Sequence, residues 1–250
     1  MYINDTNIVF YLLAAIVGLG IGQLVDWMNE RLIENKKIFS RDIFRKYKIE
    51  FKPNYILMLM TATIYVCLVY QFGIQDTFIA NLNLIKYVIL TPMLLSVFII
   101  DYKKQIIPNR LNLTMFEVGI VIAFLYGISN TAITIDMLLG MVAGIAIFLV
   151  ISLIVSLFYG IEAMGLGDIK FIGALGLYFG FANIVVISII AFLIGAIFGI
   201  VLLISKRKKK DEYISFGPFI VIATFISIFI PFETLLFALR MIFTLGMYKK

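Results

Sequence analysis

Long apolar runs separated by short polar segments are the dominant pattern along this chain. A helix that crosses the roughly 30 Å hydrocarbon layer of a membrane needs about 20 apolar residues. The pattern predicts such helices at 8–28, 54–73, 78–100, 111–129, 136–159, 169–181, 183–205 and 214–231. The uncharged stretch 171–205 has 35 residues, too many for one span, and its division is expected near Gly180. The segment after Pro231 is either a ninth span or an interfacial helix.

These runs predict an all-α fold, a polytopic membrane helical bundle of about eight transmembrane helices forming a single integral-membrane domain over residues 1–250. Hydrophobic residues make up 62% of the chain and charged residues 14%, which excludes a soluble domain. The N-terminus has neither a basic segment nor a small-residue cleavage pattern, so the first run is expected to stay as a helix. The chain has no His and one Cys, Cys67, so we expect no metal site built on Cys or His.

The Lys and Arg residues are gathered between apolar runs. Eight of the 21 lie in 31–52, three in 103–110 and five in 206–210. Such clusters are typical of cytoplasmic loops that face anionic lipid. The net charge of +6 therefore indicates membrane lipids as partners, and no nucleic acid.

The basic segment 29–53 is expected to be a short cytoplasmic loop, which puts the N-terminus outside. The other cytoplasmic connections are then 102–110, 160–168 and 206–213, and the outer ones are 74–77, 130–135 and 181–182. The outer connections contain no Lys or Arg, as the positive-inside rule requires. Asp101 ends the third span and Asp168 lies between the fifth and sixth, so both are expected at the cytoplasmic boundary, where two carboxylates can meet.

Asp101 has two interpretations. It follows the apolar run "TPMLLSVFII" with no polar transition, and an acid there is costly to ionise, which makes it a functional candidate. Alternatively, it is a helix-end residue solvated by the interface beside Lys103 and Lys104.

Asp168 stands in "EAMGLGDIK", residues 162–170. Gly165 and Gly167 permit positive φ, a tight turn and the close approach of another chain. Asp168 is expected to open the next helix, either as a helix cap or as a functional group. Lys170 is either an anchor on the cytoplasmic side or part of the site, and Glu162 is either a solvated loop acid or part of the site.

Two carboxylates within a few ångströms of each other cannot both ionise easily, so they share one proton. The ionised partner can deprotonate a water while the protonated one polarises a peptide carbonyl. Hydrolysis by such a dyad requires neither His, Cys nor a metal, so the composition fits it without selecting it.

Four segments resemble the type IV prepilin leader peptidases, a family of membrane aspartic proteases. They are "MGLGDIKFIGALGLYFG" (164–180), like the family's GxGD segment; "FIIDYKKQIIPNRLN" (98–112), like its first-aspartate segment; "ISFGPFIVIA" (214–223), like its Phe-Gly-Pro segment; and, more loosely, "GLGIGQLVDWMNERL" (18–32), like its glycine-rich N-terminal helix. The resemblance implies that Asp101 and Asp168 are the catalytic aspartates. It also implies that Gly165, Gly167, an acid at Glu162 and a lysine at Lys170 support the site.

The chain also departs from that family. Bacterial members carry a zinc module with two CxxC pairs, and segment 29–53 has no Cys. Asn109 stands where the family usually has an acid, and Gln23 where it commonly has Ser. Many bacterial members also methylate the new amino terminus with S-adenosylmethionine, so this cofactor is expected only if that activity is retained. Archaeal preflagellin peptidases lack the zinc module too, but their first aspartate lies nearer the N-terminus, and the bacterial layout fits better.

The resemblance implies an aspartic endopeptidase of the cell membrane that cuts the basic leader from type IV pilin or pseudopilin precursors on the cytoplasmic side. A different class is a transporter that uses Asp101, Glu117 and Asp168 as proton or cation sites. The position of both aspartates at one membrane edge speaks against transport. An inactive assembly scaffold is the third alternative.

Overall fold

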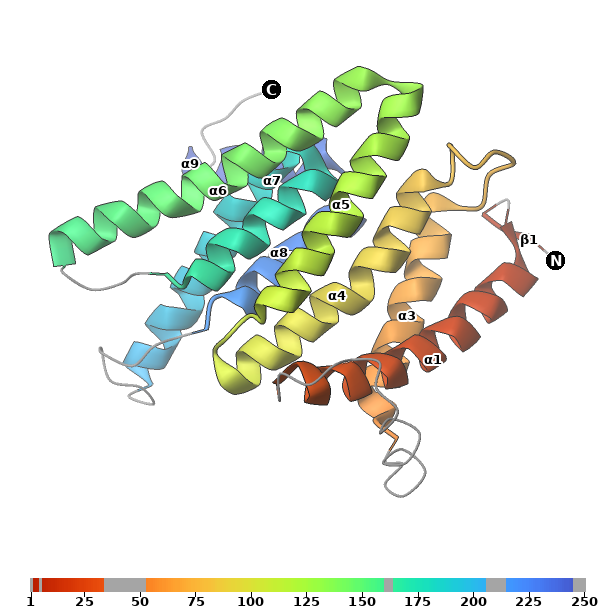
Figure 1. The fold of residues 1–250 in the computed structure, drawn as a ribbon, viewed down its shortest axis with the longest axis horizontal. Helices are drawn as coiled ribbons and strands as arrows, with labels where there is room; N and C mark the ends of the chain where they lie inside the picture. The colour runs from red at the N-terminus through yellow and green to blue at the C-terminus, as the bar shows by residue number, and fades with distance from the viewer. Residues whose placement is uncertain (1, 5, 34–52, 160–163, 206–214, 245–250) are drawn as a thin grey trace. The chain divides into compact units, whose positions relative to one another are not determined.

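The computed structural model describes residues 2–4, 6–33, 53–159, 164–205 and 215–244, and these residues are mostly helical (Figure 1). Its helices are α1 (Ile8–Ile33), α3 (Tyr55–Phe72), α4 (Leu82–Lys104), α5 (Asn109–Ser129), α6 (Thr131–Tyr159), α7 (Leu166–Ile204), α8 (Gly217–Phe229) and α9 (Phe232–Phe243). A short antiparallel hairpin of β1 (Tyr2–Ile3) and β2 (Thr6–Asn7) precedes α1. Six of the described helices are long and apolar enough to cross a membrane. The predicted all-α polytopic membrane fold is confirmed.

Helix α7 is interrupted at the predicted place. Gly180 has φ 75° and ψ 179°. These values lie outside the helical region, and glycine adopts such a positive φ readily because it has no Cβ. A side chain there would collide with the carboxylate of Asp136, whose Oδ1 accepts a hydrogen bond from the Phe181 amide at 3.2 Å. Asp136 thus caps the second half of α7, and the division expected near Gly180 is confirmed.

The two halves of α7 both pack on α6 (Figure 1). A Cβ added at Gly144 would lie 2.9 Å from the Ile172 carbonyl oxygen and 3.4 Å from the Ile184 side chain, one from each half. Further along, the Phe148 ring of α6 lies 5.1 Å from the Phe192 ring. The second half therefore runs alongside α6, and the chain reverses direction at the glycine.

Contacts group the described residues into two compact units. The first includes residues up to Lys103 together with 108–111, and the second includes 104–107 together with the residues from Asn112 onward. In the first unit α1 packs on α3 through glycines: a Cβ at Gly18 would lie 2.5 Å from the Ala62 Cα. Small residues allow this backbone approach, which is typical of helix pairs in membranes.

Helix α4 contains Pro92, which has no N–H to donate to the carbonyl four residues earlier. That carbonyl belongs to Val88, and the buried Tyr65 hydroxyl of α3 donates to it at 2.9 Å. A neighbouring helix thus replaces the missing donor, which is how proline is accommodated inside membrane helices.

In the second unit α5 packs against the first half of α7. The Tyr178 hydroxyl donates to the Met115 carbonyl at 2.8 Å, and a Cβ at Gly119 would lie 2.9 Å from the Leu177 Cβ. Helix α9 is 12 residues long, about 18 Å at the helical rise per residue, which is too short to cross the hydrocarbon layer. This short length favours the interfacial alternative for the segment after Pro231.

Candidate active site

Two of the described Asp and Glu residues are buried, and they are the two that the sequence singled out. Asp101 is 3% exposed and Asp168 is 4% exposed. The other described acids are half-buried or exposed, and Glu117 in the middle of α5 is exposed. Burying a carboxyl group is costly unless its surroundings compensate, so these two aspartates are the strongest candidates for catalytic residues.

Asp101 lies in the last turn of α4. Its neighbour Ile100 is fully buried, whereas Tyr102 is 73% exposed, so the boundary between interior and surface falls at the aspartate. The helix runs to Lys104 and ends where Gln105 adopts a positive φ of 55°. Pro108 follows, as is common just beyond a helix end. The sequence placed Asp101 at the end of the third span, and the helix continues by three further residues.

Asp168 lies in the first turn of α7, but it does not open the helix. The helix begins at Leu166, and the Asp168 amide donates to the Gly165 carbonyl at 3.0 Å. Asp168 is therefore the third helical residue rather than the cap that the sequence suggested. The first turn of a helix presents free N–H groups and partial positive charge, which still favours a carboxylate there.

The glycine before Asp168 serves close packing rather than an unusual backbone angle. Within the described residues the glycines with positive φ are Gly73 and Gly180, so the expectation of positive φ in the GxGD turn is wrong. A Cβ at Gly167 would lie 3.3 Å from the Ile107 Cβ. The connection between α4 and α5 therefore packs closely on this glycine, while the predicted approach of another chain stays a prediction.

Asn112 is a residue that the sequence analysis missed. It lies in the first turn of α5 and is 1% exposed, and its Nδ2 donates to the Gly167 carbonyl at 3.1 Å. A signal was available in the sequence. Asn112 continues a stripe of buried positions on α5, at Met115, Gly119 and Ile122, and it is the polar member of that stripe.

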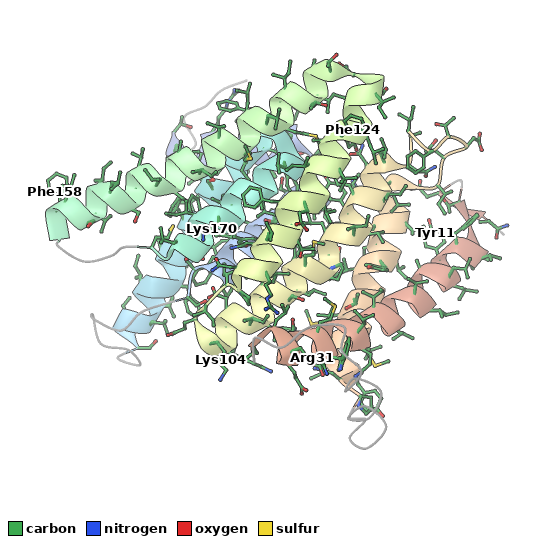
Figure 2. The ribbon with its side chains drawn as sticks, viewed as in Figure 1. Tyr11, Arg31, Lys104, Phe124, Phe158 and Lys170 are labelled. Carbon is green, nitrogen blue, oxygen red and sulfur yellow. The ribbon has the colours of Figure 1, made fainter. Side chains whose placement is uncertain are left out.

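The other candidate residues are not all brought to the site. Lys170 is exposed two residues after Asp168, near the start of α7 (Figure 2). Gly165 is half-buried and precedes the helix, where its carbonyl accepts from the first turn. Glu162 lies outside the residues that the structure describes. Within the described ranges, no group of three or more His, Cys, Asp or Glu residues is arranged to hold a metal ion.

Comparisons with known proteins add to this picture. Residues 88–200 match the model of the Type IV leader peptidase family. The Aeromonas salmonicida protein named prepilin leader peptidase/N-methyltransferase is 31% identical over 140 residues, covering 56% of this chain and 47% of that protein. The protein of the same name from Xanthomonas campestris is 29% identical over 203 residues, covering 78% of this chain and 67% of its own. The one from Vibrio cholerae is 33% identical over 138 residues, covering 55% and 52%.

The chain spans about half the length of the first of these relatives. No solved structure matches it.

Proposed function

Because residues 88–200 match the type IV leader peptidase family, we propose that the chain is an aspartic endopeptidase that removes the basic leader of prepilin-like precursors at the cytoplasmic face of the membrane. One observation carries the proposal. Asp101 and Asp168 are the buried acids of the described residues, and both lie inside the segment 88–200 that matches the family. The proposal requires that the two carboxyl groups meet and share one proton when a substrate is bound.

The helix ends suggest which aspartate has which role. Asp168 is in the first turn of α7, where free N–H groups favour a negative charge. Asp101 is in the last turn of α4, where free carbonyl oxygens disfavour one. We assign the ionised role to Asp168 and the shared proton to Asp101.

The reaction then needs these two side chains and one water. Asp168 accepts a proton from the water as the water oxygen attacks the scissile carbonyl carbon, and Asp101 donates its proton to the carbonyl oxygen. The tetrahedral product collapses when Asp168 passes its proton to the leaving nitrogen and a hydroxyl proton returns to Asp101. The C–N bond breaks, and both carboxyl groups end in their starting states.

The substrate would place its apolar helix in the bilayer and its basic leader in the cytoplasm. Glu162 is the first candidate to attract that leader, since an acidic group near the turn complements positive charge. The basic segment 29–53 has eight Lys or Arg residues in 31–52, so it would repel the leader, and we assign it to anionic lipid. Glu162 and residues 34–52 lie outside the described ranges.

Cleavage of a prepilin precursor by the reconstituted protein tests this function. N-terminal sequencing of the product identifies the bond that is cut. A double variant, Asp101→Asn with Asp168→Asn, should abolish cleavage while inserting normally. Asp76→Asn and Glu117→Gln are matched controls, because both acids are exposed, and they should retain activity. Cleavage by the double variant would refute the aspartic mechanism. Ion flux through liposomes that contain the unchanged protein, lost in the Glu117→Gln variant, would favour the transporter instead.

Thiol labelling tests the proposed orientation. Each test variant carries one thiol at an exposed position in a Cys67→Ser background. Gln75→Cys lies in a predicted outer connection, and Lys103→Cys lies in a predicted cytoplasmic one. A membrane-impermeant maleimide should label Cys introduced at 75 in intact cells and that at 103 only after lysis. The reverse pattern would invert the topology.

The printed names of the relatives include a second activity, N-methyl transfer. One observation in the first unit is compatible with binding of the methyl donor. Asn29 on α1 is 3% exposed, and neither its Nδ2 nor its Oδ1 has a hydrogen-bond partner in the described chain. An asparagine amide can bind adenine through one donor and one acceptor. We propose that Asn29 would hold the adenine of S-adenosylmethionine, which supplies a methyl group to the new amino terminus.

Binding measured without catalysis tests this second proposal. Membranes containing the protein should bind labelled S-adenosylmethionine, and Asn29→Leu should weaken that binding at least about tenfold, since two hydrogen bonds are lost. Asn83→Leu, at an exposed position, is the matched control. Absence of binding by the unchanged protein, or equal binding by Asn29→Leu, would refute the assignment.

A further inference from the structure

The first turns of α5 and α7 are tied together by one side chain. The Asn112 Nδ2 donates to the Gly167 carbonyl at 3.1 Å, across 55 residues of sequence. That carbonyl belongs to the peptide unit whose nitrogen is the Asp168 amide. The hydrogen bond therefore acts on the backbone that carries the aspartate, because the Gly167 carbonyl carbon is bonded directly to the Asp168 nitrogen.

A second contact acts on the same peptide from the connection between α4 and α5. A Cβ at Gly167 would lie 3.3 Å from the Ile107 Cβ, so glycine is what lets Ile107 pack there. Ile107 is 9% exposed and Asn112 is 1% exposed, so water does not separate either one from the turn. The start of α7 is thus held by an apolar contact and a buried hydrogen bond.

Packing alone does not explain an asparagine at this position. The rest of the buried stripe on α5 is made of Met115, Gly119 and Ile122, and a leucine at 112 would continue it. The Asn112 Oδ1 is buried with no hydrogen-bond partner among the described residues. A buried acceptor without a partner costs about 1–3 kcal/mol, so the asparagine is less favourable for stability than an apolar side chain of similar size.

We propose that Asn112 is a positioning residue for Asp168: its amide fixes the Gly167–Asp168 peptide and thereby the direction of the catalytic carboxyl group. The inference rests on the proposed peptidase function. A carbonyl oxygen has two lone pairs, so Gly167 can accept this side-chain donor in addition to a bond within the helix. Misplacement of a reacting group by about 1 Å can lower a rate about 100-fold, so one such bond can matter for turnover.

The kinetic test separates positioning from folding. Asn112→Leu removes the donor and should lower kcat about 10- to 100-fold with little change in KM for a prepilin precursor. Asn112→Thr keeps a hydroxyl donor and should recover part of the lost kcat. Asn112→Leu should also be at least as thermostable as the unchanged protein, because it removes a buried acceptor. Asn109→Leu makes the same change at an exposed position of the same turn and is the matched control.

A measurement that needs no catalysis keeps the two proposals apart. Amide hydrogen exchange in residues 166–171 should be faster in Asn112→Leu than in Asn109→Leu, because the first turn of α7 has lost its tie to α5. If the unchanged protein cleaves no prepilin, the proposed function fails, and the exchange result still decides whether Asn112 holds the turn. Unchanged amide exchange in Asn112→Leu would overturn the inference. A fall in thermostability that leaves so little folded protein that it accounts for the measured loss of activity would also overturn it.

Discussion

The end of α4 and the start of α7 each carry a buried aspartate, yet the two regions are built differently. Asp101 and Asp168 differ by one percentage point in exposure, at 3% and 4%. One lies in the last turn of its helix and the other in the first turn. The comparison teaches that equal burial does not mean equal electrostatics, because the free backbone groups at the two helix ends have opposite polarity.

The backbone around the two aspartates also differs. At the end of α4, Gln105 takes a positive φ and Pro108 follows. The start of α7 depends on contacts from far along the chain, with Ile107 against Gly167 and the Asn112 amide on the Gly167 carbonyl. Changes outside α7 are therefore expected to reach Asp168 through these two contacts.

The largest effect is expected from Asp168→Asn. The amide keeps the volume of the side chain but cannot accept a proton from water, so kcat should fall by about 10³-fold or more, measured by gel-based cleavage of a prepilin precursor. Expression and insertion should stay near normal. Substantial activity in this variant would remove Asp168 from the reaction.

Asp101→Asn should be strongly impaired but less so than Asp168→Asn. An amide can still donate a hydrogen bond to the carbonyl oxygen, which is the part of the protonated role that does not need proton transfer, so we expect a loss of about 10²-fold. Both variants are compared in one assay at saturating substrate. Equal residual rates, or a higher rate for Asp168→Asn, would reverse the assignment of roles.

Gly167→Ala tests the packing that only the start of α7 requires. The added Cβ would lie 3.3 Å from the Ile107 Cβ, so the turn must shift by a few tenths of an ångström, and kcat should fall about 3- to 10-fold. Gly167→Val should be worse, because a branched side chain needs more room. Ile107→Ala combined with Gly167→Ala should recover most of the loss. A double variant no better than Gly167→Ala would mean that the contact is not the cause.

The smallest effect is expected from Lys170→Ala. Lys170 is exposed, and an exposed charge contributes about 0–1 kcal/mol to an interaction, so kcat and KM should each change by about twofold. A loss comparable to that of Gly167→Ala would give Lys170 a role in the site that its exposure does not suggest.

Much of the fold could be predicted from the sequence. The helices α1 and α3 to α8 were expected near their observed positions, although α8 has 13 residues and is shorter than the span predicted at 214–231. The break in α7 was expected near Gly180, where it occurs. The apolar length of a membrane helix can be read along the chain, since each residue contributes its own preference for hydrocarbon. The ends of helices were less accurate: α7 begins two residues before Asp168, because a first turn is set by backbone bonds as well as by residue type.

The candidate aspartates came from the sequence, but their surroundings did not. Hydrophobicity and the GxGD pattern singled out Asp101 and Asp168, and they ranked Glu117 as an alternative intramembrane acid. Glu117 proved to be exposed, whereas both aspartates are buried, a difference that depends on which face of each helix packs against its neighbours.

The sequence by itself determined the membrane fold, the order of the helices and the two candidate acids. The tertiary structure decided why Gly167 is a glycine, which is to admit Ile107, and which side chain reaches its carbonyl, which is Asn112. The physical reason is range. Transfer into hydrocarbon is a property of neighbouring residues along the chain, whereas a hydrogen bond across 55 residues exists only once the helices have packed.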